Sequence, residues 1–169
     1  IVQKYLERHT AAGAVLVATV PPIGALRAAA RLARDHPRQF GTAEATLSLA
    51  PMVATPELAR DLFFSASMPE TQVNSYQQRL QDESYRAFLD MLALNLVKAK
   101  RVSQVPMLVL VGEGDVIVSR RQILRTAAQY GATAEIFPNM AHDMMLEPGW
   151  RDVAERIDGW LTRQMVTTS

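Results

Sequence analysis

Residues 105–115 read VPMLVLVGEGD, and this stretch decides the fold. An apolar run rich in Val and Leu changes abruptly into Gly and acidic residues. A short apolar run bounded by turn residues is typical of a strand that is buried on both faces of a parallel sheet. Open α/β sheets place their chemistry at the carboxyl ends of such strands. The stretch therefore predicts a parallel strand that ends in a functional loop at Asp115.

A second loop of this kind ends at His142. Residues 133–137 read TAEIF and predict a short strand, which a Pro-Asn turn closes just before His142. Taken alone, Asp115 can be explained as a turn residue, and His142 can be explained as a histidine with a structural role. Both residues, however, follow a strand and precede a helix. A carboxylate beside an imidazole fixes its tautomer and stabilises the imidazolium, so the two loops together predict an acid–histidine pair.

The elements around this pair are predicted from helix start and stop signals. Ser119 with Gln122 three residues later forms a capping-box pattern, and Gly131 predicts the end of that helix. A further helix is expected after Pro148, with an apolar face over residues 150–161. Both helices are expected to pack on the sheet.

The stretch from Val105 to Leu161 resembles the C-terminal end of the α/β-hydrolases, in particular their esterase, lipase and lysophospholipase-like members. That family carries its triad in the chain order Ser, then Asp or Glu, then His. The resemblance implies that Asp115 is the orienting acid and His142 the base. It also implies an α/β fold class, with mostly parallel strands, flanking helices and an inserted all-helical lid.

The nucleophile of such a triad is not found in the sequence. The family places its serine on a strand-to-helix turn, G-x-S-x-G, and none of the serines here has both flanking glycines. Residues 1–9 resemble the rest of the helix that leaves this turn. The turn, the oxyanion hole and the N-terminal half of the fold are therefore expected upstream of Ile1, and residues 1–169 alone are expected to be inactive.

Three segments are predicted along the chain. Residues 1–23 contain the end of a helix and a strand over 14–20, residues 24–101 form a helical lid or cap, and residues 102–169 carry the acid and histidine loops. Within the lid, Thr55 before Pro56 predicts a helix start, and the Ser67–Glu70 segment repeats this signal. An apolar stripe at helical spacing then runs from Tyr85 to Leu96.

Apolar residues near the histidine and in the lid are candidates for substrate binding, although core packing is the more common role for such side chains. The candidates are Met140, Met144, Phe63, Tyr76 and Tyr85. The two tyrosines also allow an epoxide or haloalkane hydrolase, because epoxide hydrolases of this fold use lid tyrosines as proton donors and an Asp nucleophile.

Three other carboxylates lie near the pair. Glu113 and Glu147 rank well below Asp115 as the acid, since the first precedes the tip of its loop and the second lies near a helix start. Asp143 is expected to serve local loop or cap chemistry. The Gly112-x-Gly114 pattern lacks the third glycine of a dinucleotide fingerprint and is a weak signal. The triad mechanism that the resemblance implies requires no cofactor, so none is expected.

Composition narrows the classes of protein to which the chain can belong. The chain has 169 residues, 49% of them apolar, a formal net charge of +1 and no cysteine. This content suits one sizeable core, and the scattered basic residues give no nucleic-acid footprint. No apolar run is long enough to span a bilayer, and the histidine spacing predicts no metal site. We expect a cytoplasmic protein, with secretion left open because a signal peptide could precede Ile1.

Two hypotheses of different classes follow. The first is a serine hydrolase acting on a small or medium apolar ester. The second is a non-catalytic or truncated portion of such an enzyme, since the nucleophile is not among these residues. The identity of the residue at the upstream strand-to-helix turn would distinguish an ester hydrolase from an epoxide or haloalkane hydrolase.

Overall fold

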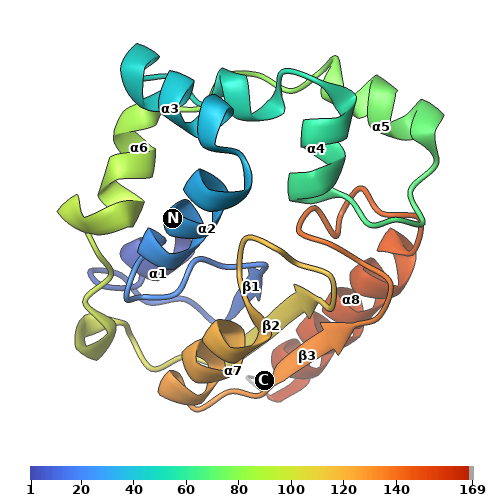
Figure 1. The fold of residues 1–169 in the computed structure, drawn as a ribbon. Helices are drawn as coiled ribbons and strands as arrows, with labels where there is room; N and C mark the ends of the chain where they lie inside the picture. Colours follow the sequence, from blue (N-terminus) through green and yellow to red (C-terminus); the bar gives the residue numbers. More distant parts are fainter. Residues whose placement is uncertain (168–169) are drawn as a thin grey trace.

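The computed structural model describes residues 1–167, with side chains up to residue 164, and three parallel strands form its sheet (Figure 1). The strands are β1 (Ala14–Val17), β2 (Met107–Gly112) and β3 (Ala134–Phe137), in the order β1-β2-β3. Both ladders are parallel, with Leu16 opposite Val109 and Val111 opposite Ile136. The predicted strand at residues 105–111 is thus the central one of the described sheet.

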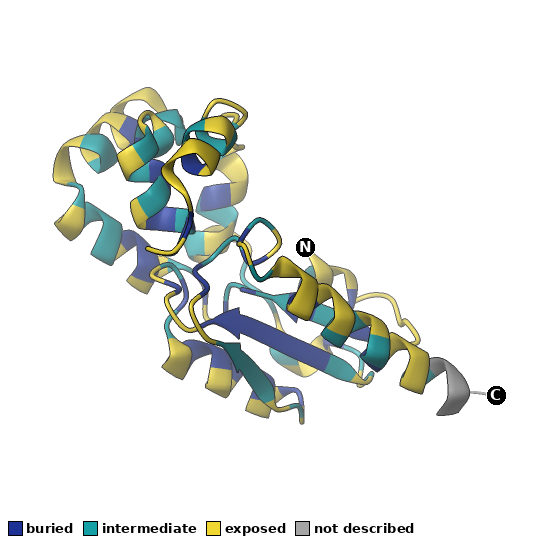
Figure 2. Ribbon diagram, turned by 90° about the vertical axis from the view of Figure 1, so that its right-hand side faces the viewer, coloured by how far each residue is buried: buried dark blue, intermediate teal, exposed yellow. Residues whose placement is uncertain are grey.

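Alternation along β2 directs its side chains into two separate cores. Val109 and Val111 face a cluster that contains Leu6, Leu16 and Ile123, whereas Leu108 and Leu110 face a second cluster. That second cluster contains Met140, Met144, Val153 and Trp160. Successive strand residues point to opposite faces, so a strand covered on both sides must be apolar throughout. Figure 2 shows β2 as a buried strand between helices on either side.

The helices on these two faces begin and end largely as predicted. They are α7 (Arg120–Gln129) on one face and α8 (Trp150–Thr167) on the other. Ser119 and Gln122 form the expected capping box at the start of α7, and Gly131 follows its end with a φ of 68°. The left-handed conformation at a helix end favours glycine.

The insertion between β1 and β2 contains only helices in the described chain, and Figure 1 shows them together above the sheet. The α-helices are α2 (Leu26–Asp35), α3 (Pro37–Thr46), α4 (Pro56–Phe63), α5 (Glu70–Gln77) and α6 (Tyr85–Leu89). Short turns of other helix types lie at η1 (Ala50–Val53), η2 (Asp90–Leu94) and η3 (Ala99–Arg101). Thr55 caps α4 as predicted. The division at residues 23/24 and 101/102 stays a prediction, and residues 168 and 169 of its last segment lie outside the described residues.

The insertion has small apolar cores of its own. One contains Ala59, Phe64, Met68 and Val73, and the other contains Ala43, Met52 and Leu62. Because α4 contributes to both clusters, it is the central helix of the insertion. Its last residue, Phe63, leads directly into the segment that meets the histidine loop.

The strand predicted over residues 14–20 ends at Val17, because Ala18 takes a left-handed φ of 44°. Trp150 and Leu161, at the two ends of the apolar face predicted on α8, are exposed.

Three further expectations need correction. Residues 1–9 were expected to be helical, but helix α1 spans only Val2–Tyr5. It buries Gln3, whose side-chain amide donates to Thr19 and accepts from Tyr130. The second correction concerns the helix start predicted at Ser67–Glu70. The N-cap of α5 is Pro69, which makes no side-chain capping bond.

The third correction concerns the stripe from Tyr85 to Leu96. A π-helical turn, η2, interrupts it after α6, and only Phe88 of the predicted stripe is buried. Such a turn adds a residue per turn and rotates the following side chains away from one face.

Candidate active site

The acid and histidine loops meet at the carboxyl ends of β2 and β3. The Glu113 amide donates to the carbonyl of Phe137, and the Gly114 amide to that of Met140, both over 2.8 Å. A Cβ at Gly112 would lie 2.6 Å from the Met140 carbonyl oxygen and closer still to that of Ala141. Only glycine permits this approach, so Gly112 is a packing requirement for the site rather than part of a dinucleotide motif.

Asp115 uses both of its carboxylate oxygens. Oδ1 accepts from the amides of Ile117 and Val118, each over 2.8 Å, and Oδ2 lies 2.9 Å from Nδ1 of His142. The Asp115 side chain is only 1% exposed. Asp115 is therefore both a turn residue and the partner of His142. The bonds within the turn fix the carboxylate that contacts the imidazole.

His142 lies at the edge of the buried region, with its side chain 20% exposed. In the tautomer with the proton on Nδ1, the imidazole donates to Asp115 and leaves Nε2 able to accept a proton. The Phe63 ring lies 6.0 Å from the imidazole, centre to centre, with the planes inclined at 37°. His142 therefore lies between the acid loop and the end of α4.

The charges around His142 favour its protonated form. Burial, the largest influence, lowers the pKa of His142, but the hydrogen bond and charge of Asp115 act in the other direction. With smaller contributions from Asp143 and Glu83, the net effect raises the pKa of His142 above its usual value. The imidazole is thus a stronger base than a free histidine.

Asp143 is tied to the insertion through its backbone. Its amide donates to the Phe63 carbonyl over 3.0 Å, and its side chain is half-buried. Burial raises the pKa of the Asp143 carboxyl, His142 lowers it, and Glu83 raises it further. Asp143 therefore affects His142 through its charge, besides the local role expected of it.

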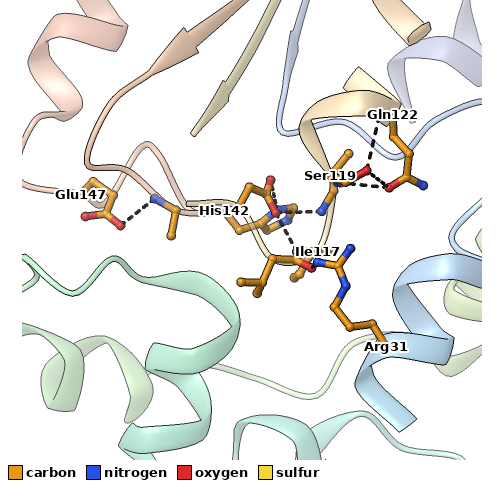
Figure 3. A network of polar contacts seen from close by, with 10 residues as sticks. Arg31, Ile117, Ser119, Gln122, His142 and Glu147 are labelled. Atoms are coloured by element: carbon orange, nitrogen blue, oxygen red, sulfur yellow. Dashed lines mark hydrogen bonds and ion pairs between the residues drawn. The ribbon is translucent and has the colours of Figure 1, made fainter. Parts of the chain in front are cut away.

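The insertion also contacts the acid loop. Arg31 of α2 donates a hydrogen bond to the carbonyl of Val116, directly after Asp115 (Figure 3). This contact joins residues far apart in the sequence. Both loops of the candidate site are thus in contact with the insertion.

Glu147 is fully buried, and in Figure 3 it lies on the opposite side of His142 from Ser119 and Gln122. Its Oε1 accepts from the amides of Ser65 and Ala141 over 2.6 and 3.1 Å, and its Oε2 accepts from the Ser65 hydroxyl over 2.7 Å. Its position near a helix start ranked it below Asp115 as the acid, and nothing in the sequence pointed to Ser65. The available signal was its place directly after the apolar run Met144-Met145-Leu146, because glutamate is rarely buried unless it is paired.

The five candidates for substrate binding are not gathered at one place. Met140 and Met144 are buried in the core cluster beneath α8, and Tyr76 stacks on Phe64 inside the insertion. Phe63 is the candidate beside His142.

Tyr85 lies on α6, which Figure 1 places on the opposite side of the insertion from α4. Its ring lies 5.7 Å from that of Phe88. Burial, and then a hydrogen bond with Glu44, raise the pKa of Tyr85. Tyr85 is therefore engaged with neighbours that belong to the insertion.

Two general features of the described residues bear on the kind of site. No group of three or more His, Asp or Glu side chains in this part of the chain has the arrangement of a metal site. No helix of the described residues is long and apolar enough to cross a bilayer.

Comparison with known proteins identifies the fold. No protein-family model and no curated protein sequence matches the chain. Solved structures do, and one is a thermophilic esterase from Thermogutta terrifontis, with 20% identity, a TM-score of 0.56 and 90% of this chain covered. A membrane phospholipase A described as a bacterial virulence factor gives 15% identity, a TM-score of 0.61 and 98% coverage. A protein of Mycobacterium tuberculosis described as a putative non-heme bromoperoxidase gives 15% identity, a TM-score of 0.64 and 99% coverage of this chain.

The chain spans between 54 and 63% of the length of these structures. It shares with them a mixed α/β architecture with a parallel sheet and flanking helices. At this level of identity the likeness concerns the fold. The chain therefore has the fold of the α/β-hydrolases, over part of their length.

Proposed function

We propose that the protein containing this chain is a serine hydrolase that cleaves a carboxylic ester. The observation that carries the proposal is the 2.9 Å contact between Asp115 Oδ2 and His142 Nδ1, on loops that follow neighbouring parallel strands. An esterase and a phospholipase A among the structures of similar fold support a hydrolase.

In the proposed reaction, Nε2 of His142 takes the proton from a serine hydroxyl as its oxygen attacks the ester carbonyl carbon. His142 then gives this proton to the leaving alcohol as the ester C–O bond breaks and an acyl-enzyme forms. Water attacks the acyl-enzyme in the same way and releases the acid. Asp115 holds the imidazole in the required tautomer and stabilises the imidazolium without itself accepting the proton.

The serine is proposed to come from a segment outside residues 1–169, together with the donors of the oxyanion hole. The sheet edge supports this arrangement, because β1 pairs with β2 alone among the described strands. An unpaired edge of a parallel sheet is a place where another strand can add. The partner we propose for this edge is the N-terminal part of the same fold.

For the apolar side of the substrate we propose contact with Phe63, whose ring lies beside His142. Tyr76 would act behind it by supporting Phe64, and Met140 and Met144 by filling the core under the histidine loop. A small or medium apolar ester remains the proposed substrate class.

The test is covalent labelling of the full-length protein with a fluorophosphonate, which reacts with an activated serine, followed by mass spectrometry. We expect one labelled serine outside residues 1–169, together with turnover of p-nitrophenyl butyrate. An absence of labelling with hydrolysis of an epoxide would indicate an Asp nucleophile instead. An absence of both labelling and ester turnover would contradict the proposal and favour a non-catalytic role.

A further inference from the structure

Glu147 is the one described carboxylate that is completely buried near the site, and the proposed reaction makes no use of it. It bridges two regions that are distant in the sequence, because Ser65 belongs to the helical insertion and Ala141 immediately precedes His142. A carboxylate loses much of its hydration in such a place and needs hydrogen-bond donors in return. Here, two amides and a hydroxyl supply them.

Asp143, which follows His142, is also held by the helical insertion. The Asp143 amide donates to the carbonyl of Phe63, two residues before Ser65. Ala141 and Asp143 are therefore both fixed against segment 63–65, the first through Glu147 and the second directly. The backbone that carries the imidazole has a support at each of its neighbours.

We propose that Glu147 is a positioning residue that clamps the histidine loop to segment 63–65 of the helical insertion and so orients the imidazole of His142 toward Asp115. In this arrangement, the insertion supports the site at the end of α4. The proposal rests on the proposed function for its kinetic consequence, whereas its geometric consequence is independent of the reaction.

The hydrogen bonds indicate which substitutions separate geometry from charge. A glutamine at position 147 can keep both amide bonds with its carbonyl oxygen, and its NH₂ group can donate to the Ser65 hydroxyl. A leucine has similar bulk but leaves the Ser65 and Ala141 amides unpaired in a buried place. Glu147→Gln therefore tests the charge, and Glu147→Leu tests the clamp.

The first experiment compares these two variants of the full-length protein with Ile123→Ala. Ile123 is buried in the cluster on the α7 side, which contains no residue of the histidine loop or of segment 63–65, so its truncation supplies a loss of stability without breaking the clamp. We expect Glu147→Leu to lower kcat by roughly 10- to 100-fold with little change in KM, since a displacement of about 1 Å can cost that much. Glu147→Gln and Ile123→Ala are expected to stay close to the parent kcat at temperatures where all variants are folded.

A second readout does not depend on turnover. The proton between Nδ1 of His142 and Asp115 is expected to give a strongly downfield NMR signal in the parent protein and in Glu147→Gln. We expect this signal to be absent from the spectrum of Glu147→Leu. Amide exchange at Ser65 and Ala141 should be accelerated in Glu147→Leu alone. If the parent shows this signal but no ester turnover, the proposed function fails while the clamp is still tested.

The Ser65 hydroxyl offers an internal control. Ser65→Ala removes one of the three bonds to Glu147 and keeps the amide bond, so its effect on kcat should be smaller than that of Glu147→Leu. In the Glu147→Leu background the same change should have no further effect. Retention of the parent kcat and of the downfield signal in Glu147→Leu, at a stability loss equal to that of Ile123→Ala, would overturn the proposal.

Discussion

At the scale of single residues, the site depends on how Asp115 divides its two oxygens. One oxygen is held by the Ile117 and Val118 amides, and the other contacts His142. The carboxylate is therefore fixed before it meets the imidazole. Such a fixed partner lowers the reorganisation that a proton transfer requires.

Asp115→Asn tests this division. An asparagine can keep the two amide bonds through its oxygen, but its NH₂ group would then face Nδ1 and favour the wrong tautomer of His142. We expect the kcat for an ester to fall on the order of 10⁴-fold, with little loss of stability. Thermal unfolding of the variant is the control, and activity near that of the parent would assign the orienting role to another carboxylate.

The raised pKa of His142 also predicts a pH dependence of stability. The folded state binds the imidazole proton more tightly than the unfolded chain, whose histidine has the ordinary pKa of about 6.5. The stabilisation from the protonated pair is therefore complete below about pH 6.5 and is lost as the pH rises through the higher, folded value.

Chemical denaturation at a series of pH values measures this effect. The stability difference between the parent and His142→Gln should shrink as the pH rises through that window. A difference that grows with pH would mean that the pKa of His142 is lowered in the folded state.

At the scale of elements, two parallel strands place the loops side by side, and Gly112 lets them meet. A methyl group at this position would clash with backbone carbonyls of the histidine loop, which cannot rotate away as a side chain could. The contact is one of backbone against backbone.

We expect Gly112→Ala to destabilise the fold by about 1–3 kcal/mol. It should also lower kcat, because the histidine loop must shift away from Asp115. Gly41→Ala is a matched control, since a Cβ there meets no atom within 4 Å. If Gly112→Ala and Gly41→Ala had the same stability in denaturant and the same kcat, the close approach of the histidine loop to Gly112 would be contradicted.

Most elements could be predicted from local sequence, but the contacts between distant ones could not. The run over residues 105–111, the capping box of Ser119 and Gln122, and the strand at 133–137 are local patterns with local causes. The Asp115–His142 contact also follows, since neighbouring parallel strands end at one edge.

Contacts made by the insertion have no such local signal. The bonds of Glu147 to Ser65 and of Arg31 to Val116 depend on how the insertion packs. The stripe from Tyr85 to Leu96 buries only Phe88, and a π-helical turn interrupts it after α6. Local propensity does not fix such packing.

At the scale of the whole molecule, the sheet has an open side at β1. The described strands give β1 a single partner, although both of its faces lie against covered surfaces. We expect residues 1–169, when produced alone, to self-associate through this edge and to show no ester turnover. Light scattering after size-exclusion chromatography measures the association, and a stable monomer would count against a missing neighbouring strand.

The proposed role of His142, oriented by Asp115, is that of the general base of an ester hydrolase. Its most direct test is the kcat of the full-length His142→Ala variant with p-nitrophenyl butyrate, compared with the parent at the same folded fraction. We predict a loss of roughly 10⁴- to 10⁶-fold, as expected for the removal of a triad member. Turnover within a few-fold of the parent would show that another residue is the base and would contradict the assignment.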